Sequence, residues 1–236
     1  KRQFTKCVAL IQNYALIQEG ITFTVWHITP NGKKTRILST GNEQGMPKKI
    51  LNIYGASSMR GMASLDFVLD LNPYKKQMRT RFVEIPAFED IDYKIKVHGY
   101  ISKCSFGCGR TSKDRQSIYI NKRPVEYPIL LQGCNEIYRS FNNVQYPTVF
   151  LNFEISPKLV DVNVTPDKRT VMLHNERCVV DVFKESLQQY YDIQELELPV
   201  SSVSSSQANS SKKRRIDPGT CLLYTSPSPR DTERSR

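Results

Sequence analysis

The residues with the clearest chemical potential are a lysine and an arginine that directly follow a proline turn. Valines alternate with polar residues over 160–164, and this period of two predicts a strand with one buried face. The tripeptide at 165–167 ends the strand, because its proline lacks an amide donor and holds the preceding residue extended. A strand can resume at 170–173, so Lys168 and Arg169 are expected on the loop between two strands. A lysine that a rigid scaffold presents on a loop can contact a phosphate; a solvated turn is the simpler alternative.

A second set of cations flanks another predicted strand, at 116–121. Its members are Arg110, Lys113, Arg115, Lys122 and Arg123. Two nearby glycines, Gly107 and Gly109, expose backbone donors, and bases combined with such donors can hold phosphates. The set therefore predicts contacts with a nucleic-acid backbone, although exposed basic loops are also common without any ligand.

Other chemistries fit the sequence poorly. Cys104 and Cys108 with His98 could begin a zinc site, but no fourth ligand follows at a suitable spacing, so no metal site is predicted. The segment at 107–113 lacks the residue order of a Walker loop. The three histidines have no serine or cysteine at a spacing that would indicate a nucleophilic site.

The composition favours a polyanionic partner. The 236 residues carry 34 lysines and arginines against 23 acids, a net charge of +11, with 39% hydrophobic residues, enough for a core. The six cysteines are scattered, which fits reduced thiols inside a cell. We found neither a signal peptide nor an apolar run long enough to cross a membrane, so no membrane partner is expected.

The predicted elements that position these cations mix helices and strands. Helical spacing of apolar residues predicts helices at 4–18, 47–55, 128–142 and 179–190, with Pro124 and Pro128 bracketing the start of the third. The polar stretch at 72–92, interrupted by two prolines, predicts a loop. Strands are predicted at 21–26 and 35–38 as a hairpin, and at 65–69, 93–101, 116–121, 148–155 and 160–164. Ile95 and Val97 should point inward, and Tyr119 should face away from Ile118 and Ile120. The pattern predicts an α/β or α+β sandwich with one face of a sheet covered by helices, and we expect the α+β class.

The character of the chain changes after Pro199. Seven serines lie within 201–211, and a run of four bases follows at 212–215. We predict that 197–220 is a disordered linker rich in Ser, Lys and Arg, whose basic run could serve nuclear import or simply solubility. Residues 221–236 read like the in-frame translation of a sequencing adapter and are left out of the fold prediction.

Two ordered blocks carry a family resemblance. The residues GRTSKDRQ at 109–116 with INKRP at 120–124, followed by VDVNVTPDK at 160–168, resemble the MutL family of DNA mismatch-repair proteins. The likeness covers about residues 1–195 and is greatest to the eukaryotic post-meiotic-segregation-type subunit of the MutL alpha heterodimer.

The resemblance implies a fold and a mechanism. In this family an ATPase domain precedes a transducer domain like domain 2 of ribosomal protein S5, which contains a left-handed strand–helix–strand crossover. Residues 1–19 would be a remnant helix at the end of the ATPase domain, and residues 20–196 would be the transducer. Lys168 matches the family lysine that reaches the γ-phosphate of ATP, a catalytic and cofactor-binding role.

The same resemblance limits what these residues would do alone. The family's metal-binding Asn, catalytic Glu and glycine-rich lid lie upstream, and its nuclease region lies downstream, so the intact protein would use ATP and Mg²⁺ while this fragment would hold neither. Whether the chain itself is an enzyme therefore stays open. Implied partners are double-stranded DNA, a MutL-homologue heterodimer partner and a MutS-type mismatch recognition complex, in the nucleus.

Two alternatives remain at this level. The same fold could serve a non-enzymatic S5-like nucleic-acid-binding module, because a fold does not dictate a function. It could also be the transducer of a type II topoisomerase. The block that ends at Lys168 favours the mismatch-repair reading, since a plain RNA-binding module needs no phosphate-sensing loop there.

Overall fold

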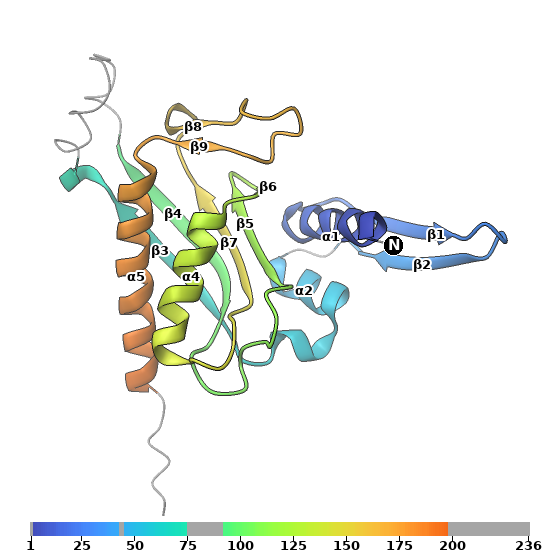
Figure 1. The fold of residues 1–236 in the computed structure, drawn as a ribbon, viewed down its shortest axis with the longest axis horizontal. Coiled ribbons are helices and arrows are strands. Elements are labelled where there is room, and N and C mark those ends of the chain that lie inside the picture. The colour runs from blue at the N-terminus through green and yellow to red at the C-terminus, as the bar shows by residue number, and fades with distance from the viewer. Residues whose placement is uncertain (1, 43–44, 75–91, 198–236) are drawn as a thin grey trace, which may run out of the picture. The chain divides into compact units, whose positions relative to one another are not determined.

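The structure is a computed structural model that describes residues 2–42, 45–74 and 92–197. Its centre is a five-stranded mixed sheet in the order β3-β4-β7-β5-β6 (Figure 1). The predicted linker at 197–220, apart from its first residue, and the segment 221–236 lie outside the described residues, as does most of the predicted loop at 72–92. At the start of that loop the chain forms a short 3-10 helix, Asn72–Tyr74.

Three of the neighbouring strand pairs in this sheet are antiparallel, and one pair is parallel. Strand β3 (Met62–Asp70) pairs with β4 (Lys94–Ser102), and β4 pairs with β7 (Val149–Glu154), both antiparallel. Strand β5 (Gln116–Ile120) runs parallel to β7 and forms a hairpin with the edge strand β6 (Arg123–Val125).

Helix α4 (Pro128–Phe141) connects β5 and β6 to β7. In Figure 1 strands β5 and β7 point upward, α4 lies in front of the sheet, and the chain moves leftward from β5 to β7. This path makes the crossover left-handed, a rare exception to the usual hand. It agrees with the expectation from the S5-like fold.

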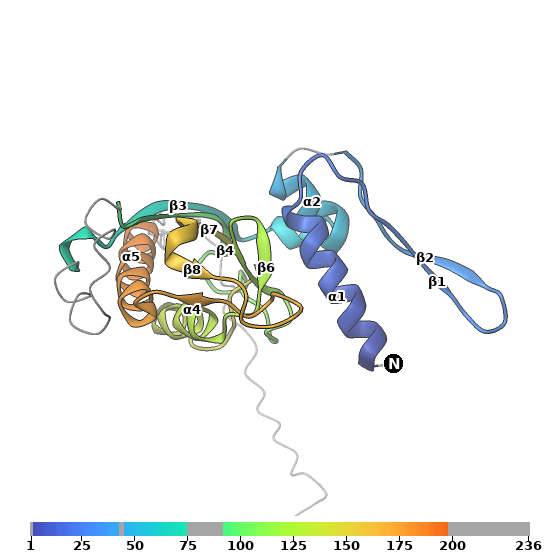
Figure 2. The ribbon, with the colours of Figure 1, turned by 90° about the horizontal axis from the view of Figure 1, so that it is seen from above.

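Helix α5 (Glu176–Glu197) lies beside α4 on the same face of the sheet (Figure 2). The core between these helices and the sheet is aromatic: the Phe183 ring packs against those of Phe67 and Phe153, with ring centroids 6.2 and 5.4 Å away. Ile95 and Val97 are 1% and 0% exposed in this core, so their predicted inward orientation is confirmed.

The opposite face of the sheet is partly covered as well. Helix α1 (Arg2–Ile17) and helix α2 (Met46–Tyr54) pack their residues Leu16, Ile17 and Ile50 against Tyr119 and Phe150. Tyr119 does face away from Ile118, as predicted, but it is fully buried. The predicted α+β class is confirmed, and at this end of the sheet α1 and α2 cover the second face as well, which the order of elements does not show.

Two short antiparallel pairs complete the described chain. Strands β1 (Thr24–Ile28) and β2 (Lys34–Ser39) form the predicted hairpin, with β1 beginning three residues later than expected. Strands β8 (Val160–Asp161) and β9 (Met172–Leu173) bracket the Lys168 loop. None of the described helices has the length and apolar character needed to cross a membrane.

The strand predicted at 160–164 is the clearest error. Only Val160 and Asp161 are in a strand, and Val164 is 39% exposed. The physical reason is local: the amide of Asn163 donates to the side-chain carboxylate of Asp161 at 2.9 Å, an Asx turn that competes with strand pairing. Val160 and Val162 are half-buried against the core, but Val164 is not, so the predicted buried face does not extend to the end of the segment.

The structure also contains an edge strand that the sequence did not predict. Pro124 lies within β6, whereas the two prolines at 124 and 128 were read as bracketing the start of a helix. Proline is tolerated here because β6 is the last strand of the sheet and its outer side needs no ladder donor. Helix α4 does begin at Pro128, the first helical position, where a missing amide costs nothing.

Candidate phosphate and nucleic-acid contacts

The loop between β8 and β9 presents Lys168 on a hydrogen-bonded turn. The Lys168 amide donates to the Thr165 carbonyl at 2.9 Å, which closes the predicted turn. The Thr165 hydroxyl donates to the Asp167 carboxylate at 2.7 Å, and the Arg169 amide donates to the same oxygen at 3.2 Å. These bonds, the hydroxyl bond first, hold the pKa of Asp167 below its ordinary value.

Lys168 itself has an unusual backbone conformation. Its φ is +53°, in the left-handed region that L-residues other than Asn, Asp and Gly seldom adopt. Its side chain is exposed, and within the described part of the chain its ammonium has no ion-pair partner. The structure thus fixes the backbone of this lysine and leaves its charge available.

Arg169, the neighbour of Lys168, holds the loop in place and does not present a free charge. Its guanidinium is paired with the Glu126 carboxylate at 2.5 Å, and its carbonyl accepts the Glu126 amide at 2.8 Å. Since Glu126 directly follows β6, these two bonds tie the Lys168 loop to the edge of the sheet. The two adjacent cations, which look equivalent in the sequence, therefore have different surroundings.

The turn between β5 and β6 is held with similar firmness. Asn121 and Lys122 have φ values of +49° and +62°, the two-residue hairpin turn in which both central residues are left-handed. The Asn121 side chain donates to the Ile155 carbonyl at 2.8 Å and accepts the Ile155 amide at 2.9 Å. The Lys122 amide donates to the buried side chain of Asn152 at 2.9 Å. The turn is thus fastened to the end of β7.

Helix α1 reaches the same turn. The Lys122 ammonium is paired with Glu19 at 3.3 Å, and the Gln18 side chain donates to the Lys122 carbonyl at 3.1 Å. At the other end of β5, the Ser117 hydroxyl donates to Asn13 of α1 at 2.8 Å. Lys122 is therefore already engaged by the two residues that follow α1, although its side chain stays exposed.

The cations before β5 have partners of their own. The Arg110 guanidinium makes two bonds of 2.7 Å to the Asp114 carboxylate, which also accepts the Ser112 hydroxyl at 2.9 Å. The Arg110 bond is the largest cause that lowers the pKa of Asp114. This bidentate pair shapes the basic loop at 103–114 and neutralises part of its charge.

Three other cations there lie over tyrosine rings. The guanidinium of Arg115 is 4.6 Å from the ring centroid of Tyr54, and burial lowers the pKa of Arg115. The ammonium of Lys113 and the guanidinium of Arg139 both lie over Tyr146, at 4.9 and 5.1 Å. Cation–ring contacts of this kind add to packing and leave part of the cation accessible.

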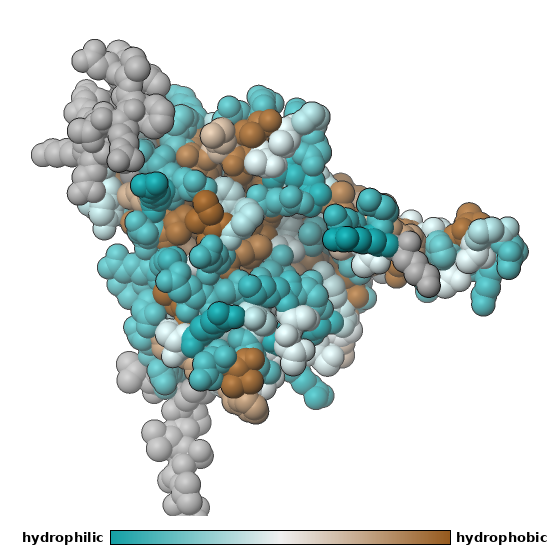
Figure 3. Space-filling view, in the orientation of Figure 1, coloured by the Kyte–Doolittle hydropathy of each residue, from teal (hydrophilic) through white to brown (hydrophobic). Residues whose placement is uncertain are grey.

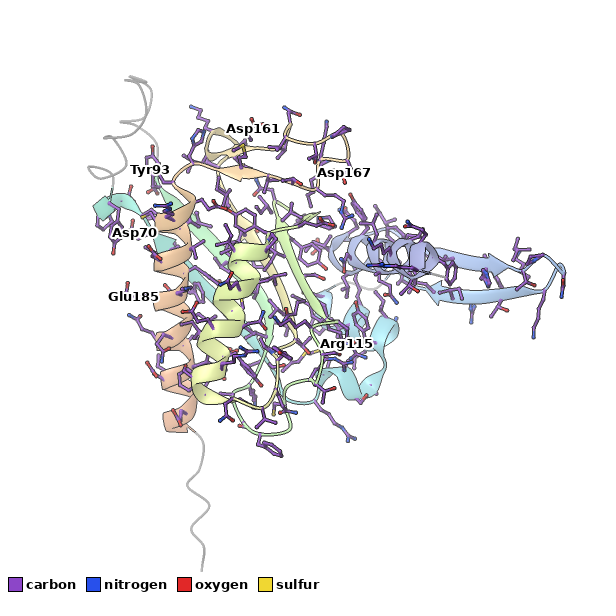
Figure 4. The ribbon with its side chains drawn as sticks, in the orientation of Figure 1. Asp70, Tyr93, Arg115, Asp161, Asp167 and Glu185 are labelled. Atoms are coloured by element: carbon purple, nitrogen blue, oxygen red, sulfur yellow. The ribbon has the colours of Figure 1, made fainter. Side chains whose placement is uncertain are left out.

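The structure separates the predicted basic set into two groups. Lys122 and Arg123 lie at the end of β5 where the Lys168 loop is tied to Glu126, while the other three cations lie at the opposite end. Figure 4 labels Asp167 and Arg115 at these two ends. The cations named from sequence are thus not one site. Arg139 was not predicted, because a single base near the end of an amphipathic helix carries no distinctive signal.

The described residues contain no group of three or more His, Cys, Asp and Glu side chains that could hold a metal ion. The cysteines considered for zinc are a buried one, Cys104, and a half-buried one, Cys108. Burial raises the pKa of the Cys104 thiol, which disfavours the thiolate that a metal needs.

Comparisons with known proteins agree with this architecture. A family model described as DNA mismatch repair protein, C-terminal domain, matches residues 71–192. DNA mismatch repair protein PMS1 of Saccharomyces cerevisiae is 56% identical over 217 residues, covering 92% of this chain and 25% of that protein. Mismatch repair endonuclease PMS2 of Homo sapiens is 29% identical over 204 residues, covering 81% of this chain and 22% of that protein.

A solved structure is similar as well. The crystal structure of the N-terminal domain of a DNA repair protein has a TM-score of 0.75 and 57% sequence identity, and the match covers 84% of this chain and 56% of that one. The chain therefore spans about a quarter of the length of the curated relatives named above.

Proposed function

Because this chain belongs to the MutL family of DNA mismatch-repair proteins, and to its eukaryotic PMS type, we propose that it contains the family's transducer. In this proposal residues 20–196 couple the binding and hydrolysis of ATP, in a domain upstream, to DNA binding and repair signalling. Residues 1–19 are the helix that leaves the ATPase domain, and residues 197–220 are a linker. In this proposal ATP is hydrolysed in the upstream domain, and the transducer contributes a residue to that site.

The observation that carries the proposal is the geometry of Lys168. Its ammonium is exposed on a turn whose backbone is fixed by the Thr165 carbonyl, by Asp167 and, through Arg169, by Glu126. Holding a lysine in the left-handed region costs free energy, and such strain is found preferentially at functional sites. A compact cation on a rigid turn suits the terminal phosphate of a bound nucleotide.

The chain would contribute one cation to a nucleotide site. ATP with Mg²⁺ supplies the phosphoryl group that is transferred to water, and Lys168 would stabilise negative charge on the terminal phosphate. Asp167, with its lowered pKa, stays ionised at neutral pH and keeps the turn closed. If Lys168 approaches the nucleotide only when the terminal phosphate is present, the position of its loop, and of the sheet edge to which the loop is tied, depends on the bound nucleotide.

The test restores the upstream region of the protein and measures ATP turnover. Lys168→Ala should lower turnover strongly, because one cation at a transferred phosphoryl group contributes several powers of ten in related chemistry, on the order of 10³. Lys158→Ala is the matched control, since Lys158 is also exposed but lies just before β8, outside the β8–β9 loop that presents Lys168. Equal turnover in Lys168→Ala and Lys158→Ala, with both proteins folded, would contradict the sensor role.

We further propose that the basic ends of β5 contact the backbone of double-stranded DNA. The support is the exposed or half-exposed state of Arg110, Lys113, Arg115, Lys122 and Arg123. Affinity should fall steeply with salt, because each neutralised phosphate releases counterions. Lys113 and Arg123 lie at opposite ends of β5. Charge reversal at either one alone should make the dependence of DNA affinity on salt less steep. A flat salt response in the unmodified protein would exclude this mode of binding.

The proposed partners and cellular location rest on membership of the family, not on a feature of the protein surface. We propose a MutL-homologue heterodimer partner, a MutS-type recognition complex, and action in the nucleus. Mismatch repair endonuclease PMS2 and DNA mismatch repair protein PMS1, the relatives matched here, are eukaryotic. Co-purification of the full-length protein with a MutL homologue, and its nuclear enrichment, would test these proposals.

A further inference from the structure

One aromatic side chain is unusually exposed on a loop whose backbone is fixed. Phe106 is 82% exposed, the highest exposed fraction among the large hydrophobic side chains of the described chain. On one side of it the Ser105 carbonyl accepts the Asn142 amide group at 3.4 Å, and on the other the Gly107 amide donates to Gln145 at 2.9 Å. The exposed phenyl ring does not gain the free energy that burial in the core would provide.

A second apolar side chain lies on the segment that holds this loop. Val144 is 68% exposed and lies between Asn142 and Gln145, the two residues whose side chains bond to the Phe106 loop. We call Phe106 and Val144 the apolar tip. In Figure 3 brown, apolar residues surface at the lower end of the viewed face, where Figure 1 draws the loops that precede β5 and β7.

Two cations lie on the segments that carry the tip. Tyr146, two residues after Val144, carries Lys113 and Arg139 over its ring, and the Arg139 guanidinium also donates to the Tyr146 hydroxyl at 2.9 Å. The carboxylate of this loop, Asp114, is already bonded to Arg110 at 2.7 Å. Lys113 and Arg139 are therefore exposed cations without a carboxylate partner among the described residues, and Tyr146, over which they lie, pairs with Arg110 of the Phe106 loop.

We propose that the apolar tip is a stacking site for an unpaired base of single-stranded DNA, with Lys113 and Arg139 holding the flanking phosphates. This assignment deepens the proposed DNA binding and rests on it. A phenyl ring offers its face to any base without regard to sequence, and a base that is paired in a duplex cannot stack on it. Cations on the neighbouring segments supply the sequence-independent part of the affinity.

Charge and shape together select this ligand. An apolar patch for an ordinary protein partner is usually larger than two side chains, and its centre is depleted of charge. Here the apolar area is two side chains, and Lys113 and Arg139 lie over Tyr146 on the same segments. Aromatic rings interleaved with bases are instead the usual platform for single strands. At the opposite end of β5, the turn cation Lys122 is paired with Glu19, so that end lacks this combination.

The experiment compares two DNA ligands with the complete chain. Fluorescence anisotropy would measure the affinity for an oligo-dT of about 16 nucleotides, the upper range of a single-strand site, and for a duplex of equal length. Phe106→Ala should weaken oligo-dT binding about tenfold, as loss of one stacked base requires, and leave duplex binding unchanged. Phe106→Tyr keeps the ring and should retain the affinity.

Two controls make the result interpretable. Ile28→Ala removes another exposed apolar side chain, 64% exposed in β1, and should change neither affinity. Thermal unfolding should be the same in Phe106→Ala as in the unmodified protein, because the ring contributes little to the core.

The possible outcomes separate the two proposals. If the unmodified chain binds both ligands with a salt dependence and Phe106→Ala binds oligo-dT equally well, the stacking site is refuted and the backbone contacts stand. An equal loss on both ligands refutes it as well, because a stacking contact must discriminate between them. If the unmodified chain binds neither ligand, the DNA-binding proposal fails and the stacking site fails with it.

Discussion

Replacing Lys168 by glycine should make the protein more stable while it removes the proposed sensor. The backbone of Lys168 is left-handed, with a φ of +53°, and the turn bonds from Thr165 and Asp167 keep it there. This conformation costs an L-residue about 1–2 kcal/mol. Glycine has no such cost, but its unfolded chain is more flexible, which lowers the free energy of unfolding by about 0.4–1 kcal/mol.

The difference is a gain of about 0.5–1 kcal/mol in the free energy of unfolding for Lys168→Gly. For a chain of this length that corresponds to a rise of about 1–4 °C in Tm. Lys168→Ala retains a Cβ atom and therefore the strain, so its Tm should match that of the unmodified protein. Lys168→Asn should fall between them, because asparagine tolerates the left-handed region.

Differential scanning calorimetry on the three variants measures this order directly. In the protein with its upstream region restored, all three should lose ATP turnover to the same extent, because each lacks the ammonium. Stability would then separate the variants while activity would not. An equal or lower Tm for Lys168→Gly relative to Lys168→Ala would refute the left-handed geometry, and with it the argument that strain is kept at this position for function.

Three further perturbations test the scaffold. Gly99→Ala should prevent stable folding, as judged by circular dichroism and solubility, because an added Cβ would lie 2.0 Å from a backbone carbonyl oxygen of the neighbouring strand. Asn121→Gly keeps the left-handed turn but loses both side-chain bonds to Ile155, so urea unfolding should show a loss of about 1–3 kcal/mol. The carboxyl of Asp114 has a lowered pKa because of Arg110, so the stability from this pair is present above about pH 4 and is lost as the pH falls further. Arg110→Ala should therefore cost stability at pH 7 and cost less in acid, and a pH-independent cost in thermal melts would contradict the pairing.

Much of the sheet was predictable because its strands carry a local signal. Strand β4 alternates cleanly between inward and outward residues, and β5 places Ile118 and Tyr119 on opposite faces, so a period of two found both. The same rule failed at 160–164, where the valines alternate but Asp161 bonds to the Asn163 amide and turns the chain. Periodicity records which side chains could share a face; it does not record a competing side-chain bond.

The candidate site was predictable in kind but not in arrangement. The cations were found because a basic run is visible in any sequence, and the turn before Lys168 because proline ends a strand. Their division between the two ends of β5 depends on the strand running between Arg115 and Lys122, and the sequence does not show which ends of neighbouring elements lie together. The difference between Lys168 and Arg169 depends on Glu126, a residue more than forty positions away in the chain.

The β5–β6 hairpin is the element on which the two halves of the proposed coupling converge. Helix α1 contacts it at both ends, through Ser117 and through the Lys122 turn. The Lys168 loop is tied to the residue after β6 by two bonds of Glu126. A close-packed sheet transmits displacement rather than absorbing it. A shift of α1 relative to the sheet, or a force on Lys168 from a bound phosphate, would therefore act on the same hairpin, whose far end carries Arg115 and the basic loop. We expect a disruption of the α1 contact, such as Ser117→Ala, to weaken the coupling between nucleotide and DNA affinity without changing either affinity measured alone.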